Sequence, residues 1–171
     1  MAKLTIQTAQ REMLLGLIDE GYDKIGWMEV SLLSAIRRVS AKEAAWRPRP
    51  GRHSIAEIVL HDAYYKYVTA RRITGGKRGS FPFAGSDWFA VPRKLSDTQW
   101  KQYVTILTDA HQTLRKAIAT APWSKLNSND KNIGVSLAHI TGIAMHDAYH
   151  TGQIKTIRAL YKQATKGRKS K

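Results

Sequence analysis

The chain has 171 residues, of which 43% are hydrophobic, and a formal net charge of +15 at pH 7. Its length suits a single globular domain, and it contains neither a run of about 18 apolar residues that would cross a membrane nor the apolar core of a secretory signal, so we expect a cytoplasmic protein. It has no cysteine, which excludes disulfides, thiolate metal ligands and a cysteine nucleophile.

The first predicted helical segment covers about residues 8 to 39. Its second half repeats apolar residues at steps of three and four, which is typical of an amphipathic helix. Gly21 and Gly26 favour a bend or a break, so this segment is expected to form one bent helix or two helices. It ends before the proline-rich stretch 46–51, which predicts an extended loop.

The second predicted helix covers about residues 54 to 73. Ser54 and Glu57 form the pattern of a capping box, and Gly75 follows the helix as an expected C-terminal cap. The loop that follows, residues 74–95, is rich in aromatic residues. A long aromatic loop is unlike an idle linker, and we expect it to pack across an end of the helices.

The third and fourth predicted helices cover about residues 97 to 121 and 135 to 164. No segment alternates in the manner of a strand, so we predict an all-α four-helix bundle, with the long loop between its second and third helices. Residues 1–164 are expected to form one domain. Residues 165–171 are basic and lack an apolar anchor from Lys166 on, so we expect a mobile tail.

Three histidines lie on the apolar stripes of these helices. His146 and His150 are four residues apart and share a helix face, and His61 lies on the stripe of the second helix. A chance pair at this spacing is expected about 0.2 times in such a chain, so the pair alone proves little. Buried polar groups need partners, and one shared divalent ion would satisfy all three. Three nitrogen ligands with open positions are typical of a catalytic metal; Zn, Ni, Fe and Mn all accept such ligands.

Two motifs around these histidines are similar to a known family. Residues 48–61 follow the pattern Pro-x-Pro-Gly-x-x-Ser-Ile-x-Glu-Ile-x-x-His, and residues 146–154 follow His-Asp-x-Tyr-His-x-Gly-Gln-Ile. Together they resemble the DinB/YfiT-like superfamily of four-helix-bundle metalloproteins, over about residues 6 to 162. The resemblance implies a left-handed bundle, often a homodimer, with His61, His146 and His150 as metal ligands and water in the remaining positions.

The family also implies classes of activity. Its characterised members include metal-dependent thiol S-transferases that use a low-molecular-weight thiol, and an isomerase; others are described as hydrolases. We therefore expect a metal-dependent transferase or hydrolase acting on a small molecule. The positive charge favours an anionic substrate, and the candidates for binding it are Arg47, Arg49 and Arg52.

Other polar residues have two interpretations each. His139 is expected to be a hydrogen-bonded histidine ahead of lining the pocket. His111 is expected to line either a pocket or the core, and His53 to be a surface or loop residue. Glu57 is expected to serve the cap ahead of orienting His61. Further residues near the motifs are expected to reach the pocket edge or to fill the core: Gln153, Tyr149 and Tyr65.

Four rival functions differ in kind. A peptidase is disfavoured, because Asp147 is shorter than the glutamate that acts as base in His-Glu-x-x-His enzymes. A di-iron bundle is excluded, because the chain has no Glu-x-x-His pair. A stress- or DNA-damage-associated protein that binds nucleic acid is the main alternative, supported by the charge but by no DNA-reading motif. The remaining alternative is a structural bundle without metal.

Overall fold

The computed structural model describes residues 5–130, 132 and 134–166, and these residues form helices, turns and loops without a strand. The prediction of an all-α fold is therefore confirmed. The helices are α1 (Ile6–Tyr22), α2 (Leu32–Ile36), α3 (Ala41–Ala45), α4 (Ile55–Thr74), α5 (Asp97–Thr120), α6 (Trp123–Leu126) and α7 (Leu137–Lys166). Among the described residues, no helix is both long and apolar enough to span a lipid bilayer.

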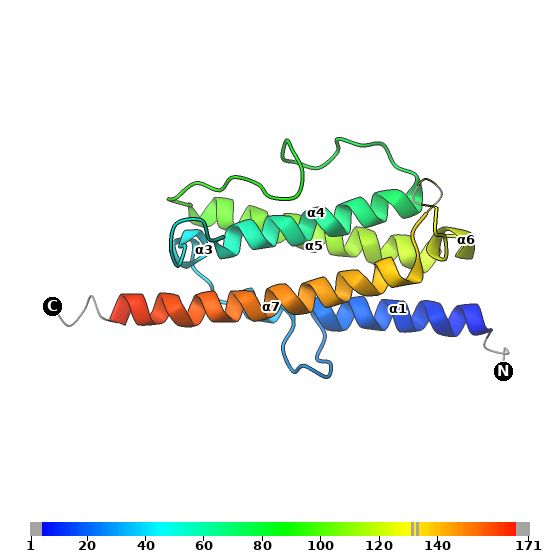
Figure 1. Ribbon diagram of the computed structural model, residues 1–171, viewed down its shortest axis with the longest axis horizontal. Helices are drawn as coiled ribbons and strands as arrows, with labels where there is room; N and C mark the ends of the chain where they lie inside the picture. The colour runs from blue at the N-terminus through cyan, green and yellow to red at the C-terminus, as the bar shows by residue number, and fades with distance from the viewer. Residues whose placement is uncertain (1–4, 131, 133, 167–171) are drawn as a thin grey trace.

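The four long helices α1, α4, α5 and α7 lie side by side along the long axis of the molecule (Figure 1). Helices α1 and α7 run in one direction, and α4 and α5 run in the opposite one. Because α4 and α5 are parallel, the chain must return along the whole length of α4 before α5 begins. The segment 75–96 makes this return.

We predicted that the loop 75–96 would cross an end of the bundle. That prediction is wrong, because the loop runs back along α4. Phe81 packs edge-on against Tyr64 with ring centroids 5.3 Å apart, and the backbone of Ser80 donates to the Tyr67 hydroxyl. Farther along, Trp88 stacks on His61 at 3.9 Å. Its aromatic side chains thus cover α4 in the described structure.

The first predicted segment, residues 8 to 39, contains two helices, α1 and α2, and α3 follows it. Helix α1 ends at Tyr22, and residues 23–31 form a loop that includes Glu29 with a positive φ of 55°. Serines cap the two short helices that follow, since the hydroxyl of Ser31 accepts from the third residue after it and that of Ser40 does the same for α3. The predicted break near Gly21 and Gly26 is present.

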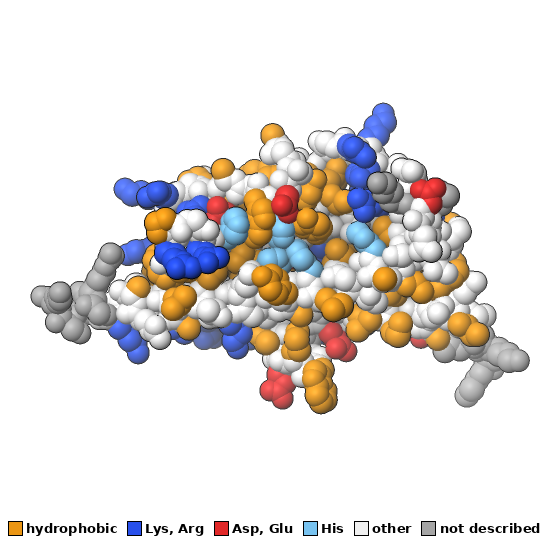
Figure 2. Space-filling view, in the orientation of Figure 1, with side chains coloured by type: hydrophobic (Ala, Val, Ile, Leu, Met, Phe, Trp, Pro, Cys, Tyr) orange, Lys and Arg blue, Asp and Glu red, His pale blue; other side chains and the backbone are white. Residues whose placement is uncertain are grey.

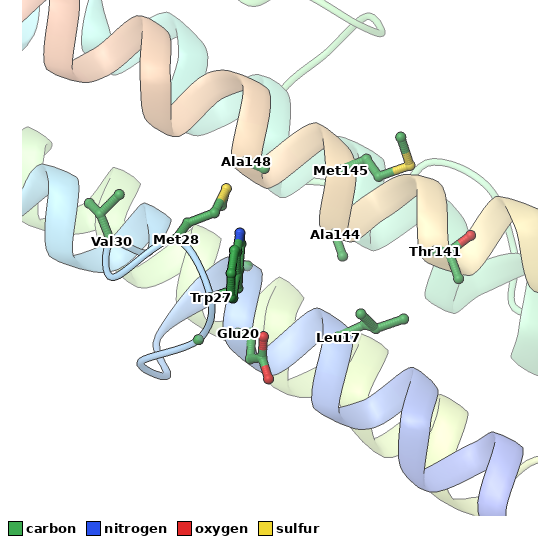
Figure 3. Close-up of a pocket in the computed structure, with 11 residues that line it drawn as sticks. Leu17, Glu20, Trp27, Met28, Val30, Thr141, Ala144, Met145 and Ala148 are labelled. Carbon is green, nitrogen blue, oxygen red and sulfur yellow. The ribbon is translucent and has the colours of Figure 1, made fainter.

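The loop 23–31 closes one side of an apolar groove between α1 and α7, with a volume of about 330 Å³ (Figure 3). Leu17 and Met145 lie on its helical walls, and Trp27 and Met28 come from the loop. Trp27 is 96% exposed. None of the described residues that line this groove is a histidine.

The ends of the later helices agree closely with the sequence. Helix α4 has the predicted capping box of Ser54 and Glu57 and ends at Gly75 in the left-handed conformation. Helix α7 continues through Lys166, so Thr165 and Lys166 belong to the helix and not to the predicted tail. The remaining tail residues, 167–171, lie outside the described part of the chain.

The core has two adjoining parts. One surrounds the first half of α4 and includes Leu60, Leu107 and Ile154; the other lies toward the end of α4 and includes Ile18, Ile73 and Leu114. Complete burial of each such side chain contributes about 1.5–3 kcal/mol through the hydrophobic effect. Packing on both sides of the middle of α4 and α7 fixes the positions of the side chains that these helices present to each other.

Candidate metal centre

The structure brings the three predicted histidines together. His61 lies in the middle of α4, and His146 and His150 lie one turn apart on α7. The Nε2 atom of His146 lies 3.0 Å from that of His61 and 3.1 Å from that of His150. One ring nitrogen from each residue therefore lies within 4.8 Å of the others. His61 and His150 are buried, and His146 is half-buried.

The opposite nitrogen of each ring faces an oxygen. His61 Nδ1 lies 3.0 Å from the carbonyl oxygen of Asp87, and His150 Nδ1 lies 2.7 Å from the Oε1 atom of Gln153. His146 Nδ1 lies 2.8 Å from Oδ1 of Asp62, although the Asp62 carboxylate forms no hydrogen bond among the described residues. Protons on the Nδ1 atoms of His61 and His150 satisfy the two hydrogen bonds and leave the Nε2 lone pairs of these rings directed at His146.

The loop before α5 supplies part of this environment. Asp87 adopts a positive φ of 67°, and its carboxylate accepts from the Tyr65 hydroxyl at 3.0 Å. Trp88 stacks between His61 and His53, with ring centroids 3.9 and 3.5 Å away. Sequence reasoning did not single out Asp87 or the position of Trp88, because a backbone carbonyl carries no sequence signal.

A buried polar cluster lies beneath the histidines. Lys66 and Asp147, both inaccessible to solvent, form an ion pair, and Asp62 is fully buried beside them. Burial raises the pKa of the Asp147 carboxyl to about 6 against the opposing effect of Lys66, and raises that of Asp62 well above its usual value. Asp62, His146 and Asp147 also place ligand atoms close together, but the Lys66 ammonium already provides a positive charge there.

Burial also sets the charge of the histidines. It lowers the pKa of His61 and of His146, and it lowers that of His150 to about 4, with the neighbouring His146 adding to the effect. All three rings are therefore neutral at pH 7. A neutral imidazole is the form that binds a metal ion.

Two of the three distances between the ring nitrogens fit a common divalent ion. Adjacent nitrogens that each lie 2.0–2.2 Å from a metal are separated by about 2.8–3.6 Å for tetrahedral to octahedral angles, and the observed 3.0 and 3.1 Å fall in this range. Neutral rings with converging lone pairs repel one another unless a cation or a proton lies between them. The donor set consists of nitrogen from three rings, as zinc and other transition ions prefer.

Comparison with family models identifies the family of this chain. The family model of the DinB superfamily matches residues 25–154. The chain belongs to the DinB superfamily. All three histidines of this DinB protein lie inside the matched range. A comparison with curated proteins found no match, and a comparison with solved structures found none either.

The remaining histidines of this DinB protein lie outside the cluster. His139 bonds to the Thr69 hydroxyl at 3.0 Å, as expected for a hydrogen-bonded histidine. His111 is buried in the core, where it stacks on Tyr22 with centroids 3.9 Å apart. His53 is an exposed loop residue as predicted, although its stacking on Trp88 was not foreseen.

The other candidates are placed as follows. Glu57 completes the cap of α4 and pairs with Arg47 at 2.8 Å, so it does not orient His61. Gln153 reaches the cluster through His150, and its amide donates to the Tyr149 hydroxyl at 2.8 Å. Asp147 faces Lys66 in the interior, which argues against a role as a general base at the histidines.

Proposed function

We propose that His61, His146 and His150 bind one divalent metal ion and that this protein is a metal-dependent enzyme of the transferase or hydrolase type. The observation that supports this most is the convergence of three neutral Nε2 atoms at 3.0 and 3.1 Å, with every Nδ1 turned to an oxygen. Isolated core histidines have no reason to share one point. Family membership adds independent support.

A bound metal of this kind acts as a Lewis acid and lowers the pKa of a water or thiol that it binds. The chain provides the environment for that chemistry. Gln153 and the carbonyl of Asp87 hold the outer nitrogens of two rings, which fixes the tautomer that leaves Nε2 free. Trp88 covers His61 and excludes water from that side.

The nucleophile would be supplied from outside the chain. The sequence has no cysteine, and the nearest amine, Lys66, is buried in its ion pair with Asp147. We therefore propose that a water molecule or a low-molecular-weight thiol attacks a small electrophilic substrate. Three points stay predictions: that the metal is zinc, nickel, iron or manganese, that the protein forms a homodimer, and the alternative that it binds nucleic acid.

Reconstitution tests the site directly. Protein freed of metal is titrated with Zn²⁺, Ni²⁺ and Mn²⁺ by calorimetry, and the same is done for His146→Ala/His150→Ala and for the control His53→Ala. We expect the wild type and the control to bind one ion per chain alike and the double variant to lose tight binding. If the wild type and the double variant bind metal equally, both the proposed metal site and the proposed enzymatic function are refuted.

Activity is tested separately on the reconstituted protein. A screen combines a low-molecular-weight thiol or water with small electrophiles, such as epoxides and activated esters, and compares metal-loaded with metal-free protein. The proposal expects turnover that depends on both the metal and His146. Metal binding without turnover across the whole screen would argue for a metal site without catalysis.

A further inference from the structure

A cavity of about 1010 Å³ opens beside the histidine cluster and reaches His150. One wall is the loop before α4, residues 48–53, and the opposite wall is the middle of α7. Trp88 and Gln153, both in contact with the histidines, also line it. The cavity is therefore continuous with the candidate metal centre and large enough for a small organic molecule.

Two arginines in this wall have no ionic partner within the described part of the chain. Among the described residues, the side chains of Arg49 and Arg52 form neither a hydrogen bond nor an ion pair, and both are exposed. Other arginines are engaged: Arg47 with Glu57 at 2.8 Å and Arg158 with Glu43 at 2.9 Å. The free guanidinium groups are thus placed at the cavity.

The described lining contains no carboxylate, although it contains two arginines and two histidines. Its local field is therefore positive. The rest of the lining is largely apolar and includes Ile58, Ile157 and Leu160. On the face drawn in Figure 2, histidine side chains gather near the middle and basic side chains lie beside them. One end of a ligand would thus meet arginine and another part would meet aliphatic side chains.

We propose that this cavity binds an organic oxyanion with an apolar body, its carboxylate or phosphate held by Arg49 and Arg52. The guanidinium fork pairs with either group through two parallel hydrogen bonds. The apolar body then lies against Ile157 and Leu160, and the ligand extends toward His150. This assignment rests on the proposed function for its meaning as a substrate site, but anion binding itself does not require the metal.

The test uses three probes with the same apolar chain: octanoate, octyl phosphate and the neutral octanol. Binding to the full chain is measured by calorimetry, both with Zn²⁺ and after removal of metal by a chelator. We expect at least one anion to bind about tenfold more tightly than octanol in both states, because only the anion can pair with arginine. The stronger of the two anions tells carboxylate from phosphate recognition.

Matched variants assign the effect to the two arginines. Arg49→Gln/Arg52→Gln should weaken binding of the anion about tenfold, and Lys101→Gln/Lys116→Gln, which removes two exposed charges of α5, should change it less than about twofold. Anion binding that is no tighter than octanol binding, or that survives the arginine changes, would overturn the assignment. Loss of metal binding with intact arginine-dependent anion binding would instead refute the proposed function alone.

Discussion

Gln153 offers a sharp test of how the histidine cluster is held. Its Oε1 atom lies 2.7 Å from His150 Nδ1, so it fixes the ring that presents Nε2 to the proposed metal. Removal of such a partner of a metal-binding histidine lowers metal affinity about 10- to 100-fold. Because Gln153 is only half-buried, water can replace its oxygen in part, and we expect Gln153→Ala to lose about tenfold, or about 1.4 kcal/mol.

The assay is a competition titration of Zn²⁺ between the protein and a fluorescent chelator. Gln163→Ala, an exposed glutamine of the same helix, is the control and should match the wild type. Gln153→Glu should raise the affinity, because a carboxylate increases the basicity of the ring. If Gln153→Ala stays within about twofold of the wild type, the outer hydrogen bond does not support the site and the reasoning is refuted.

Three further predictions concern stability, measured by denaturant unfolding. Lys66→Met should cost about 3–5 kcal/mol, because it leaves the buried Asp147 without its cation; a loss below about 1 kcal/mol would contradict the ion pair. Gly21→Ala should destabilise the protein by about 1–3 kcal/mol, because the added Cβ would lie 3.2 Å from the backbone of α7. Gly16→Ala should stabilise it by up to about 1 kcal/mol, because open space surrounds Gly16. Equal effects of the two substitutions would contradict this reasoning. Burial lowers the pKa of His111 to about 4, so on acidification His111 is protonated in the unfolded chain at a higher pH than in the folded chain. The free energy of unfolding should therefore fall by about 3 kcal/mol as the pH drops from 6.5 to 4. His111→Phe should lack this part of the fall.

The long helices were predictable because local signals agree with each other. Helix α4 begins after the capping box of Ser54 and ends at Gly75, as both residues predict. The short helices α3 and α6 were not predicted, since four or five residues carry too little periodicity. The parallel pairing of α4 and α5 was also missed, because a long loop allows either direction.

The three histidines were predictable because they interrupt apolar stripes at helical spacing. The surroundings were harder to foresee. Asp87 acts through its carbonyl and its loop conformation, neither of which a side chain reveals. Asp62, Lys66 and Thr69 repeat at steps of four and three on α4, and all three are buried. A polar stripe of that period ordinarily indicates a solvent-facing side of a helix, so the sequence pattern did not reveal this buried cluster.

Because α4 and α5 are parallel, the segment that connects them must span the length of α4, and it is longer than this span requires. The 20 residues of α4 span about 30 Å, and an extended chain covers about 3.3 Å per residue, so about nine or ten residues would bridge that distance. The segment 75–96 is more than twice as long. This slack lets the chain fold down where it passes the histidines and place Asp87 and Trp88 against His61. A shorter or longer segment 75–96 would change the part of the cavity lining that Trp88 provides without disturbing the helices.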